Sequence, residues 1–432
     1  MRKITILLFI PLMLLAGVAE ARLTIEITGG REGAMPIAVV PFAGEGVSQD
    51  RVAQIIASDL ARSGYFAPLQ QAKMPAQPHD GRSIDFAAWR RTGVEHVVVG
   101  KVSVQGAALQ VQFQLFDAVR GEQLAGYSIP TTAQRLRRVA HQISDIVYEK
   151  ITGQRGAFNT HVAYITVEEH EGSLRHRLAV AEADGFNEQI ILTSKQPLLS
   201  PAWAPDGKRL AYVSFEGGRS ELYIQDVSSG KRDKLASFKG LNSAPSWSPD
   251  GRRLAMTLSR DGNPEIYVLD VASRALTRLT FSRSIDTEPA WAPDGRSLVF
   301  TSDRGGRPQI YQLMLSGNSP QGRPRRISYA GDYNARASFS PDGSRLVMVN
   351  GENNRFRIAV QELGNGNVRL LTDNRLDESP SFAPNGSMII YATERNNRGI
   401  LEAVSVDGRA QQRLGTSAGN VREPAWSPFI SQ

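Results

Sequence analysis

The heptapeptide Pro245-Ser-Trp247-Ser-Pro249-Asp250-Gly251 decides the fold of this 432-residue chain, because it recurs with regular spacing. Copies fall at residues 201–207, 245–251, 289–295, 339–343, 380–386 and 424–428, and the last three are degenerate. Consecutive aromatic positions are 44, 44, 48, 43 and 44 residues apart, at Trp203, Trp247, Trp291, Phe339, Phe382 and Trp426. A fixed period of this length indicates a repeat architecture.

Each repeat predicts four short antiparallel strands. Pro presets φ and Gly accepts a positive φ, so Pro-Asp-Gly predicts a tight turn. An apolar strand such as residues 210–214 follows, then a polar loop, a strand such as residues 265–270 and a third one ending near residue 280. Together with the short strand around the Trp, about 44 residues form one propeller blade. The aromatic series is expected to pack between blades.

The two ends of the repeat region complement each other. Residues 163–166, 178–180 and 190–192 predict a blade without its leading strand, and residues 424–428 predict a strand without a blade. Joining them closes the ring and removes an exposed edge. The predicted fold class is an all-β six-bladed propeller over residues 158–432, with the extra residues 316–326 forming a Gly/Pro/Ser-rich loop on one face.

Three segments precede the propeller. Arg2, Lys3, the apolar residues 4–18 and Ala19-Glu20-Ala21 predict a secretory signal peptide over residues 1–21, so the mature protein would be exported and soluble. Residues 34–157 mix strands (36–41, 96–100, 111–115) with amphipathic helices (52–60, 136–151), which predicts a small α/β domain. Between them, residues 22–33 form an arm that is either free or an added strand; it begins Arg22, Leu23, Thr24, Ile25, Glu26 and Ile27.

Composition and motifs argue against several functional classes. The 50 Lys and Arg exceed the 43 Asp and Glu by a net charge of +7, but the excess is spread along the chain, whereas a nucleic-acid binder concentrates it. The chain has no cysteine, which excludes thiolate catalysis and suits an oxidising periplasm. It also lacks a Gly-x-Ser-x-Gly elbow, a phosphate-binding loop and a His-Glu-x-x-His motif. We therefore expect a protein that is not an enzyme, has no cofactor and binds no nucleic acid.

Polar residues precede each inner strand at the same offset in the repeat. The segments are Asn242-Ser243-Ala244, Asp286-Thr287-Glu288, Asn334-Ala335-Arg336, Asp377-Glu378-Ser379 and Val421-Arg422-Glu423. Because inner strands line the channel of a propeller, these residues should ring one mouth of it as an exposed docking surface. The carboxylates, above all Glu288 and Glu378, are also candidate oxygen ligands for Ca²⁺ in the channel. The alternative is that they cap loops in water.

The signal peptide, the small α/β domain and the six repeats together resemble the TolB family, the periplasmic β-propeller proteins of the Tol–Pal system. Matching stretches include residues 36–42, 153–158, 214–220, 287–289 and 376–380. The resemblance implies that the propeller mouth binds the peptidoglycan-associated lipoprotein Pal and that the arm contacts the inner-membrane protein TolA. It also implies roles in outer-membrane integrity, invagination during cell division and colicin import.

The resemblance also implies which residues face the partners. Carried over by position, Asn242, Ala244, Thr287 and Glu288 would face Pal or a colicin, with Asp377, Glu378 and Glu423 nearby; Asp286, Arg336 and Arg422 complete the mouth. Leu241 stands where relatives can carry a histidine. Other envelope lipoproteins and porins are further implied partners, and contact with a membrane would run through partners only.

Two other functional classes stay open at this stage. A propeller that binds a small molecule or sugar, or carries a cryptic hydrolase site, would show aromatic residues around the mouth for stacking, and the polar segments contain none. A purely structural assembly subunit is compatible with the same sequence.

Overall fold

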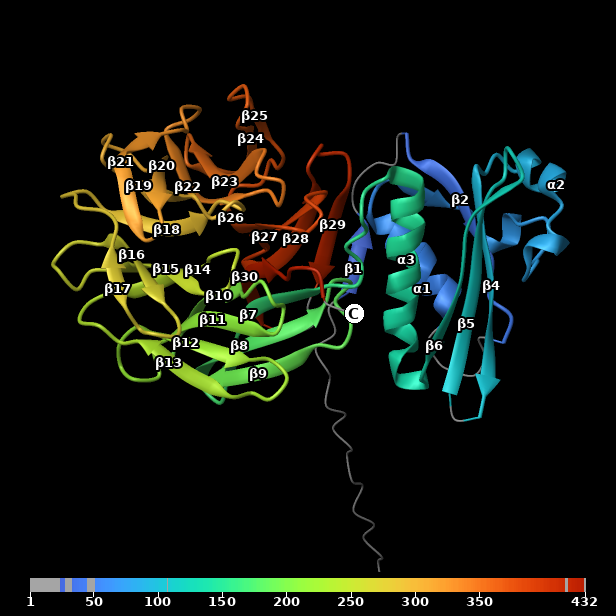
Figure 1. The fold of residues 1–432 in the computed structure, drawn as a ribbon, viewed down its shortest axis with the longest axis horizontal. Helices are drawn as coiled ribbons and strands as arrows, with labels where there is room; N and C mark the ends of the chain where they lie inside the picture. The colour runs from blue at the N-terminus through green and yellow to red at the C-terminus, as the bar shows by residue number, and fades with distance from the viewer. Residues whose placement is uncertain (1–23, 28–32, 45–50, 107, 416–418, 431–432) are drawn as a thin grey trace, which may run out of the picture.

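A computed structural model of the chain describes residues 24–27, 33–44, 51–106, 108–415 and 419–430. The predicted signal peptide, Arg22 and Leu23 lie outside the described residues. Figure 1 shows two bodies side by side, a β-propeller and a small α/β domain. Within the described part of the chain, no helix is long and apolar enough to cross a membrane.

Five blades of the propeller follow one another in the sequence, each an antiparallel sheet numbered outward from the channel. Blade 1 has β10 (Leu198–Trp203), β11 (Arg209–Ser214), β12 (Glu221–Asp226) and β13 (Arg232–Ala236). Blade 2 has β14 (Asn242–Trp247), β15 (Arg253–Leu258), β16 (Glu265–Asp270) and β17 (Leu276–Arg278). Blade 3 has β18 (Asp286–Trp291), β19 (Ser297–Ser302), β20 (Gln309–Ser316) and β21 (Ser319–Arg326). Blade 4 has β22 (Tyr333–Phe339), β23 (Arg345–Glu352), β24 (Arg355–Glu362) and β25 (Val368–Leu370). Blade 5 has β26 (Asp377–Phe382), β27 (Met388–Arg395), β28 (Arg398–Ser405) and β29 (Gln411–Gly415).

Blade 6 combines the two ends of the repeat region. Its inner strand is β30 (Asn420–Trp426), and its other strands are β7 (His161–His170), β8 (Ser173–Glu182) and β9 (Gln189–Ser194). Strand β30 pairs antiparallel with β7, from Asn420 opposite Val167 to Trp426 opposite Val162. The predicted six-bladed fold and its closure by the C-terminal strand are therefore confirmed.

The arm adds a fifth strand to blade 5. Strand β1 (Thr24–Ile27) pairs antiparallel with β29, which places Thr24 opposite Gly415 and Ile27 opposite Gln412. Of the two alternatives for the arm, its described residues thus form an added strand. This strand covers the outer edge of blade 5, which would otherwise present unpaired backbone groups.

The repeated aromatic residues pack between blades. Trp247, Trp291 and Phe382 are buried. The Trp247 Nε1–H donates to the Ala202 carbonyl of the preceding blade at 3.2 Å, and Trp203 Nε1–H donates in the same way to Ala425 at 3.1 Å. These two indoles thus join two inner strands each, whereas Trp426 Nε1–H donates to the Thr160 hydroxyl at 2.9 Å. The packing of the series between blades confirms its structural interpretation.

The α/β domain contains one sheet in the order β3-β2-β4-β5-β6. Its strands are β2 (Met35–Val39), β3 (Phe66–Pro68), β4 (His96–Gln105), β5 (Ala108–Asp117) and β6 (Glu122–Thr131); its helices are α1 (Val52–Arg62), α2 (Phe86–Arg91) and α3 (Leu136–Thr152), with short 3₁₀ turns at Gln71–Lys73, Gly81–Ser83 and Ala133–Arg135. Helices α1 and α3 cover one face of the sheet and α2 packs on the other. Helix α3 ends at Gly153, whose φ of 74° forms a left-handed cap.

Residues 316–326 correct one detail of the sequence interpretation. They form no loop but the end of a β-hairpin, because β21 pairs with β20 from Ser316 opposite Ser319 to Tyr311 opposite Arg326. Gly317, with a φ of 59°, lies in the turn between the two strands. Arg253 of blade 2 holds the turn by donating to the Gly317 carbonyl at 3.0 Å. The Gly and Pro content signalled the turn and an edge strand rather than irregular structure.

Candidate functional site: the propeller channel and its mouth

Every inner strand of the propeller has the same backbone irregularity. At one position per blade the pairing with the next strand shifts, and a non-glycine residue adopts a positive φ of 49–55°. The six residues are Ser200, Ala244, Glu288, Arg336, Ser379 and Glu423. A left-handed conformation costs about 1–2 kcal/mol for a residue with a Cβ. Its repetition in all six inner strands identifies a β-bulge that belongs to the repeat and is not a local defect.

The bulges surround a central cavity. Five of the six residues line a cavity of about 480 Å³, together with the prolines and tryptophans that follow them: Ser200, Ala244, Glu288, Arg336 and Ser379. The sixth, Glu423, reaches the backbone N–H of Ser200 with its carboxylate. The sequence-predicted Ala244, Glu288, Arg336 and Glu423 therefore belong to one ring.

Arg336 supplies a positive charge inside this ring. Its guanidinium lies 3.6 Å from the Glu288 carboxylate and 3.5 Å from that of Glu423. Burial opposes the charge, but Glu423 and Glu288 together raise the pKa of Arg336 above its ordinary value. Glu288 also accepts from the Thr301 hydroxyl at 2.9 Å and from the Arg336 backbone N–H at 3.0 Å. The channel thus holds one cation fixed between two carboxylates, a group with one negative charge in excess.

Three of the predicted mouth residues are buried rather than exposed, which corrects the expectation of an exposed polar ring. Asn242, Asp286 and Asp377 have no accessible surface. Asn242 donates to the Phe238 carbonyl at 2.8 Å, Arg304 donates to Asp286 at 2.6 Å, and Asn374 donates to Asp377 at 3.0 Å. Burial raises the pKa of both Asp286 and Asp377. These side chains fix the loops at the mouth because buried polar groups must find partners inside the protein.

The remaining predicted residues stay accessible. Arg422 is exposed, and Thr287 and Glu378 are half-buried. Glu378 and Arg422 line a separate depression between blades 5 and 6, of about 400 Å³, together with Leu376 and Glu394. The structure therefore divides the predicted set into a channel ring, buried loop anchors and accessible mouth residues.

The mouth also has an apolar rim that the sequence analysis missed. Phe281 and Tyr329 are 72% and 71% exposed, and Leu241, Ile285 and Leu376 are exposed as well. All five lie on the loops that lead into inner strands; Leu241, Ile285 and Leu376 each directly precede a buried anchor. An apolar residue at the same offset in three repeats was the available signal. Their position on loops of the same face makes them candidate contacts for a protein partner.

The two aromatic residues of the rim are held in place before any partner binds. The guanidinium of Arg278 lies over the Phe281 ring, 4.7 Å from its centroid, and that of Arg326 lies 5.0 Å from the centroid of Tyr329. The Tyr329 hydroxyl donates to the Arg326 carbonyl at 2.9 Å. Rings ordered in advance lose less conformational entropy on association.

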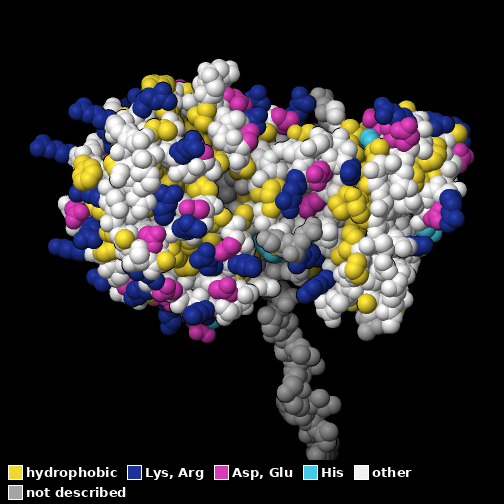
Figure 2. All heavy atoms as spheres, in the orientation of Figure 1, with side chains coloured by type: hydrophobic (Ala, Val, Ile, Leu, Met, Phe, Trp, Pro, Cys, Tyr) yellow, Lys and Arg dark blue, Asp and Glu magenta, His cyan; other side chains and the backbone are white. Residues whose placement is uncertain are grey.

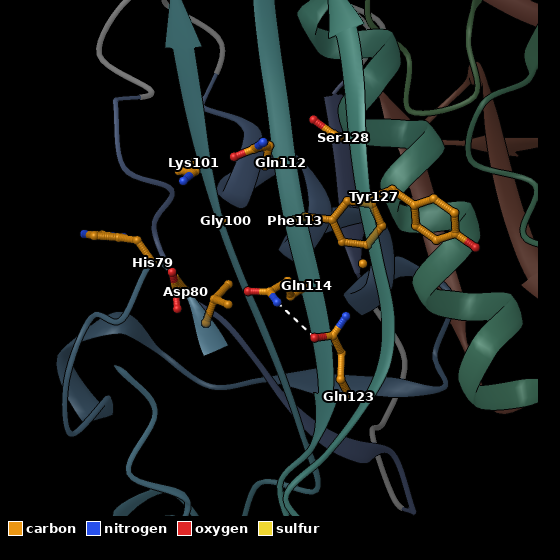
Figure 3. A pocket seen from close by; sticks show the side chains of 12 residues that line it. His79, Asp80, Gly100, Lys101, Gln112, Phe113, Gln114, Gln123, Tyr127 and Ser128 are labelled. Carbon is orange, nitrogen blue, oxygen red and sulfur yellow. Dashed lines mark hydrogen bonds between the residues drawn. The ribbon is translucent and has the colours of Figure 1, made fainter. Parts of the chain in front are cut away.

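The α/β domain has a cavity of its own, of about 400 Å³, on its sheet (Figure 3). Amide side chains of β5 and β6 line it, and Gln114 donates to Gln123 at 2.9 Å. The hydrogen bond from Arg82 lowers the pKa of Asp80, at the edge of this cavity, to about 2, so Asp80 is ionised at neutral pH and unsuited to proton transfer. The rings of Phe113 and Tyr127 turn toward α3 (Figure 3). His79 and Lys101 also line this cavity, beside the glutamine side chains.

Surface charge shows no concentration on the visible face. Lys and Arg side chains are interspersed with Asp and Glu over both bodies (Figure 2). Mixed charge of this kind is typical of a solvated protein surface, whereas a nucleic-acid footprint is a continuous basic patch.

Comparisons with known proteins cover nearly the whole chain. The family model described as "TolB amino-terminal domain" matches residues 23–124, and that of the "TolB beta propeller domain" matches residues 148–430. The Tol-Pal system protein TolB of Thioalkalivibrio sulfidiphilus is 58% identical over 417 residues, which is 95% of each chain. That of Xanthomonas campestris pv. campestris is 54% identical over 428 residues, 98% of this chain and 96% of the relative. The crystal structure of TolB from Acinetobacter baumannii is similar with a TM-score of 0.88 at 39% identity, covering 94% of this chain and 100% of that one.

Proposed function

Because the chain belongs to the TolB family, we propose that it is a non-enzymatic, periplasmic protein-binding component of the Tol–Pal system. In this proposal the propeller mouth binds Pal and the N-terminal arm binds TolA. The protein then supports outer-membrane invagination during cell division and envelope integrity. Other envelope lipoproteins, porins and colicins are further candidate partners of the same surfaces.

The observation that carries the proposal is the composition of the mouth. Two pre-ordered aromatic residues lie on loops of the mouth face, and the channel holds Arg336 fixed between Glu288 and Glu423. Buried aromatic anchors dominate the binding energy of protein interfaces, and surrounding charges set specificity. Phe281 and Tyr329 protrude on loops of different blades, and the tryptophans that line the channel cavity are held between blades. This arrangement favours a broad protein partner over a small ligand.

The test is a calorimetric titration of the mature protein, from Arg22, with the periplasmic domain of Pal. We expect saturable 1:1 binding, and we expect Glu288→Arg and Glu378→Arg to abolish it, because each places a second cation beside Arg336 or Arg422. Circular dichroism checks that both variants fold. If the folded wild-type protein does not bind Pal, a propeller that binds a small ligand becomes the leading hypothesis.

Calcium in the channel remains part of the proposal, and the same titration tests it. Glu288 already contacts Arg336, so a Ca²⁺ ion at Glu288 and Glu378 would have to compete with a guanidinium for the carboxylate. The titration is therefore run in excess calcium and in chelator. Calcium that participates in binding changes the affinity for Pal between the two conditions, and equal affinities contradict a role for it.

Arm and mouth are proposed to be coupled. The described arm residues occupy the edge of blade 5, and the inner strand of that blade, β26, carries Glu378 at the mouth. Two ligands that share one conformational equilibrium influence each other reciprocally, typically by about 1–3 kcal/mol. We expect deletion of residues 22–33 to change the affinity for Pal about 5- to 150-fold in the same titration. Unchanged affinity would show that the two sites are independent.

A further inference from the structure

The joint between the α/β domain and the propeller contains a cluster of six charged side chains, three of them buried and three partly buried. The α/β domain contributes Asp59 and Arg62 from α1 and Arg137 and His141 from α3. The propeller contributes Glu182 and Asp184 from the end of β8 and the turn after it. The side chains of His141 and Asp59 are 2% and 1% exposed. A cluster of this size at a domain boundary is costly to bury unless its charges match.

The geometry shows that His141 is a cation. Its Nδ1 lies 2.7 Å from Asp59 Oδ2, and its Nε2 lies 3.3 Å from Glu182 Oε2. Both ring nitrogens therefore face carboxylate oxygens, which accept but do not donate, so both must carry hydrogens. Protonated His141, Arg62 and Arg137 then balance Asp59, Glu182 and Asp184, three positive charges against three negative ones.

The balance is reached only across the joint. The α/β domain alone holds three cations and one anion of the cluster, and the propeller alone holds two anions. Arg137 donates to Glu182 at 2.8 Å and also contacts Asp184, while Arg62 donates to the Ala183 carbonyl at 2.8 Å. Separating the two domains would leave a net charge of +2 on the α/β domain and −2 on the propeller. Opposite charges matched in this way fix one relative orientation.

Arg137 and the protonated His141 also occupy the ligand atoms that a metal ion would need here. Asp59, His141 and Asp184 are close enough to hold one, but a metal needs a neutral imidazole nitrogen with a free lone pair. The Arg137 guanidinium already contacts both propeller carboxylates. The cluster is thus complete without a ligand, and its role is to be sought in the joint itself.

The arm is connected to this cluster through one side chain. Gln412 of β29 is the residue opposite Ile27 of the arm strand, and its side-chain amide donates to the Arg62 carbonyl. The domains approach closely beside it, since a Cβ on Gly64 would meet the Ala410 side chain at 2.2 Å. A displacement of α1 from the propeller would therefore disturb the strand on which β1 is seated.

We propose that this cluster is an electrostatic lock, which holds the α/β domain on the propeller and, through Gln412, keeps the arm strand β1 paired with blade 5. The lock needs no binding partner and does not depend on the proposed function. Breaking one side of a buried ion pair leaves uncompensated charge and is strongly destabilising. Opening the lock should therefore loosen the joint and the arm together.

The charge state of the lock is stable over the ordinary pH range. Burial disfavours the charged form of His141, but Asp59 and Glu182 outweigh it and raise the pKa of His141 to about 10. Although burial opposes ionisation, His141 and Asn187 lower the pKa of Glu182 to about 2. The other titratable groups near His141 are Asp145 on α3 and His161 on β7. Asp184, Arg62 and Arg137 are the remaining charged groups around it. The contribution of His141 is fully present below pH about 6.5 and is lost as pH rises through about 10.

The experiment compares charge-imbalanced and charge-balanced variants of the mature protein. Glu182→Gln with Asp184→Asn removes the propeller's two charges, and adding Arg137→Gln with His141→Gln restores neutrality with similar shapes. Hydrogen exchange of β1 and of α1 is followed by mass spectrometry. We expect exchange at least 10-fold faster in the imbalanced variant and largely recovered in the balanced one. Asp373→Asn, which breaks the exposed Arg355–Asp373 pair, is the matched control and should change nothing.

Gln412→Met tests the connection separately, because it removes the amide donor and retains the shape. We expect faster exchange in β1 with α1 unchanged. If hydrogen exchange of α1 is unaltered in the imbalanced variant, the proposed lock is wrong. If exchange of β1 is unaltered in both the imbalanced variant and Gln412→Met, the proposed connection to the arm is wrong. The imbalanced variant could fail to fold. In that case, a balanced variant that also fails to fold would contradict the proposed role of charge balance.

Discussion

A chain that ends at Gly419 is expected to lose the cooperative fold of the propeller. The truncation removes β30, the seven-residue inner strand of blade 6. Strand β7 then exposes the edge that β30 covers. Blades 1 and 5 also lose a neighbour, because Trp203 Nε1–H donates to the Ala425 carbonyl and the Trp426 backbone N–H donates to the Ser381 hydroxyl. Val421 and Trp426 also return apolar surface to water, at about 1.5–3 kcal/mol per large side chain. Against a total stability of about 5–15 kcal/mol, these losses together should abolish the folded ring.

Thermal unfolding followed by near-ultraviolet circular dichroism measures this effect. We expect the truncated chain to lose the sharp transition of the propeller, and we expect a peptide of residues 419–432, added in trans, to restore part of it. A control that lacks only residues 431–432 retains all of β30 and should unfold like the full chain. A sharp, unshifted transition in the truncated chain would mean that blade 6 is stable without its inner strand.

The closure was predictable from sequence because it depends on a period. Spacings of 43–48 residues identify the blades, and an incomplete unit at each end can be satisfied only by joining the two. Local chemistry predicted the other elements equally well: Gly153 caps α3, and the alternation along β5 matches its buried and exposed sides. Residues 316–326 were misjudged because glycine and proline occur in hairpins and edge strands as well as in loops.

The site was less accessible to sequence reasoning, because a residue's offset in the repeat does not fix its exposure. Asn242, Asp286 and Asp377 occupy the predicted offset, yet they face inward and bond the loops beside them. The exposed positions are the apolar residues just before them, which hydrophobicity alone would assign to a core. The interdomain lock was hidden for a different reason: its six charged residues come from three distant segments of the chain, and only the tertiary structure brings them together.

Replacement of the rim aromatic residues is expected to weaken Pal binding about 30- to 1000-fold. Phe281→Asp and Tyr329→Asp each remove an anchor that is ordered in advance and exposed, and hot-spot truncations typically cost about 2–4 kcal/mol of binding energy. Because both side chains are more than two-thirds exposed, the fold should lose little stability, within about 0.5 kcal/mol for a surface change. Calorimetric titration with the periplasmic domain of Pal gives the affinities, and thermal unfolding gives the stabilities.

Val119→Asp and Met314→Asp provide the matched controls for this measurement. Val119 lies in the turn between β5 and β6 of the α/β domain, and Met314 lies on β20 opposite Gln321 of the outer strand; both are exposed apolar residues away from the loops of the rim. We expect the affinity for Pal to be unchanged in both control variants. A loss of affinity in the controls would show that added negative charge weakens binding wherever it is placed. If the rim variants bind like the controls while Glu288→Arg still abolishes binding, the channel charges rather than the rim hold the partner. If the rim variants and the controls lose affinity equally, long-range electrostatic attraction drives binding. Added salt would then weaken the binding of the wild-type protein, because it screens such attraction.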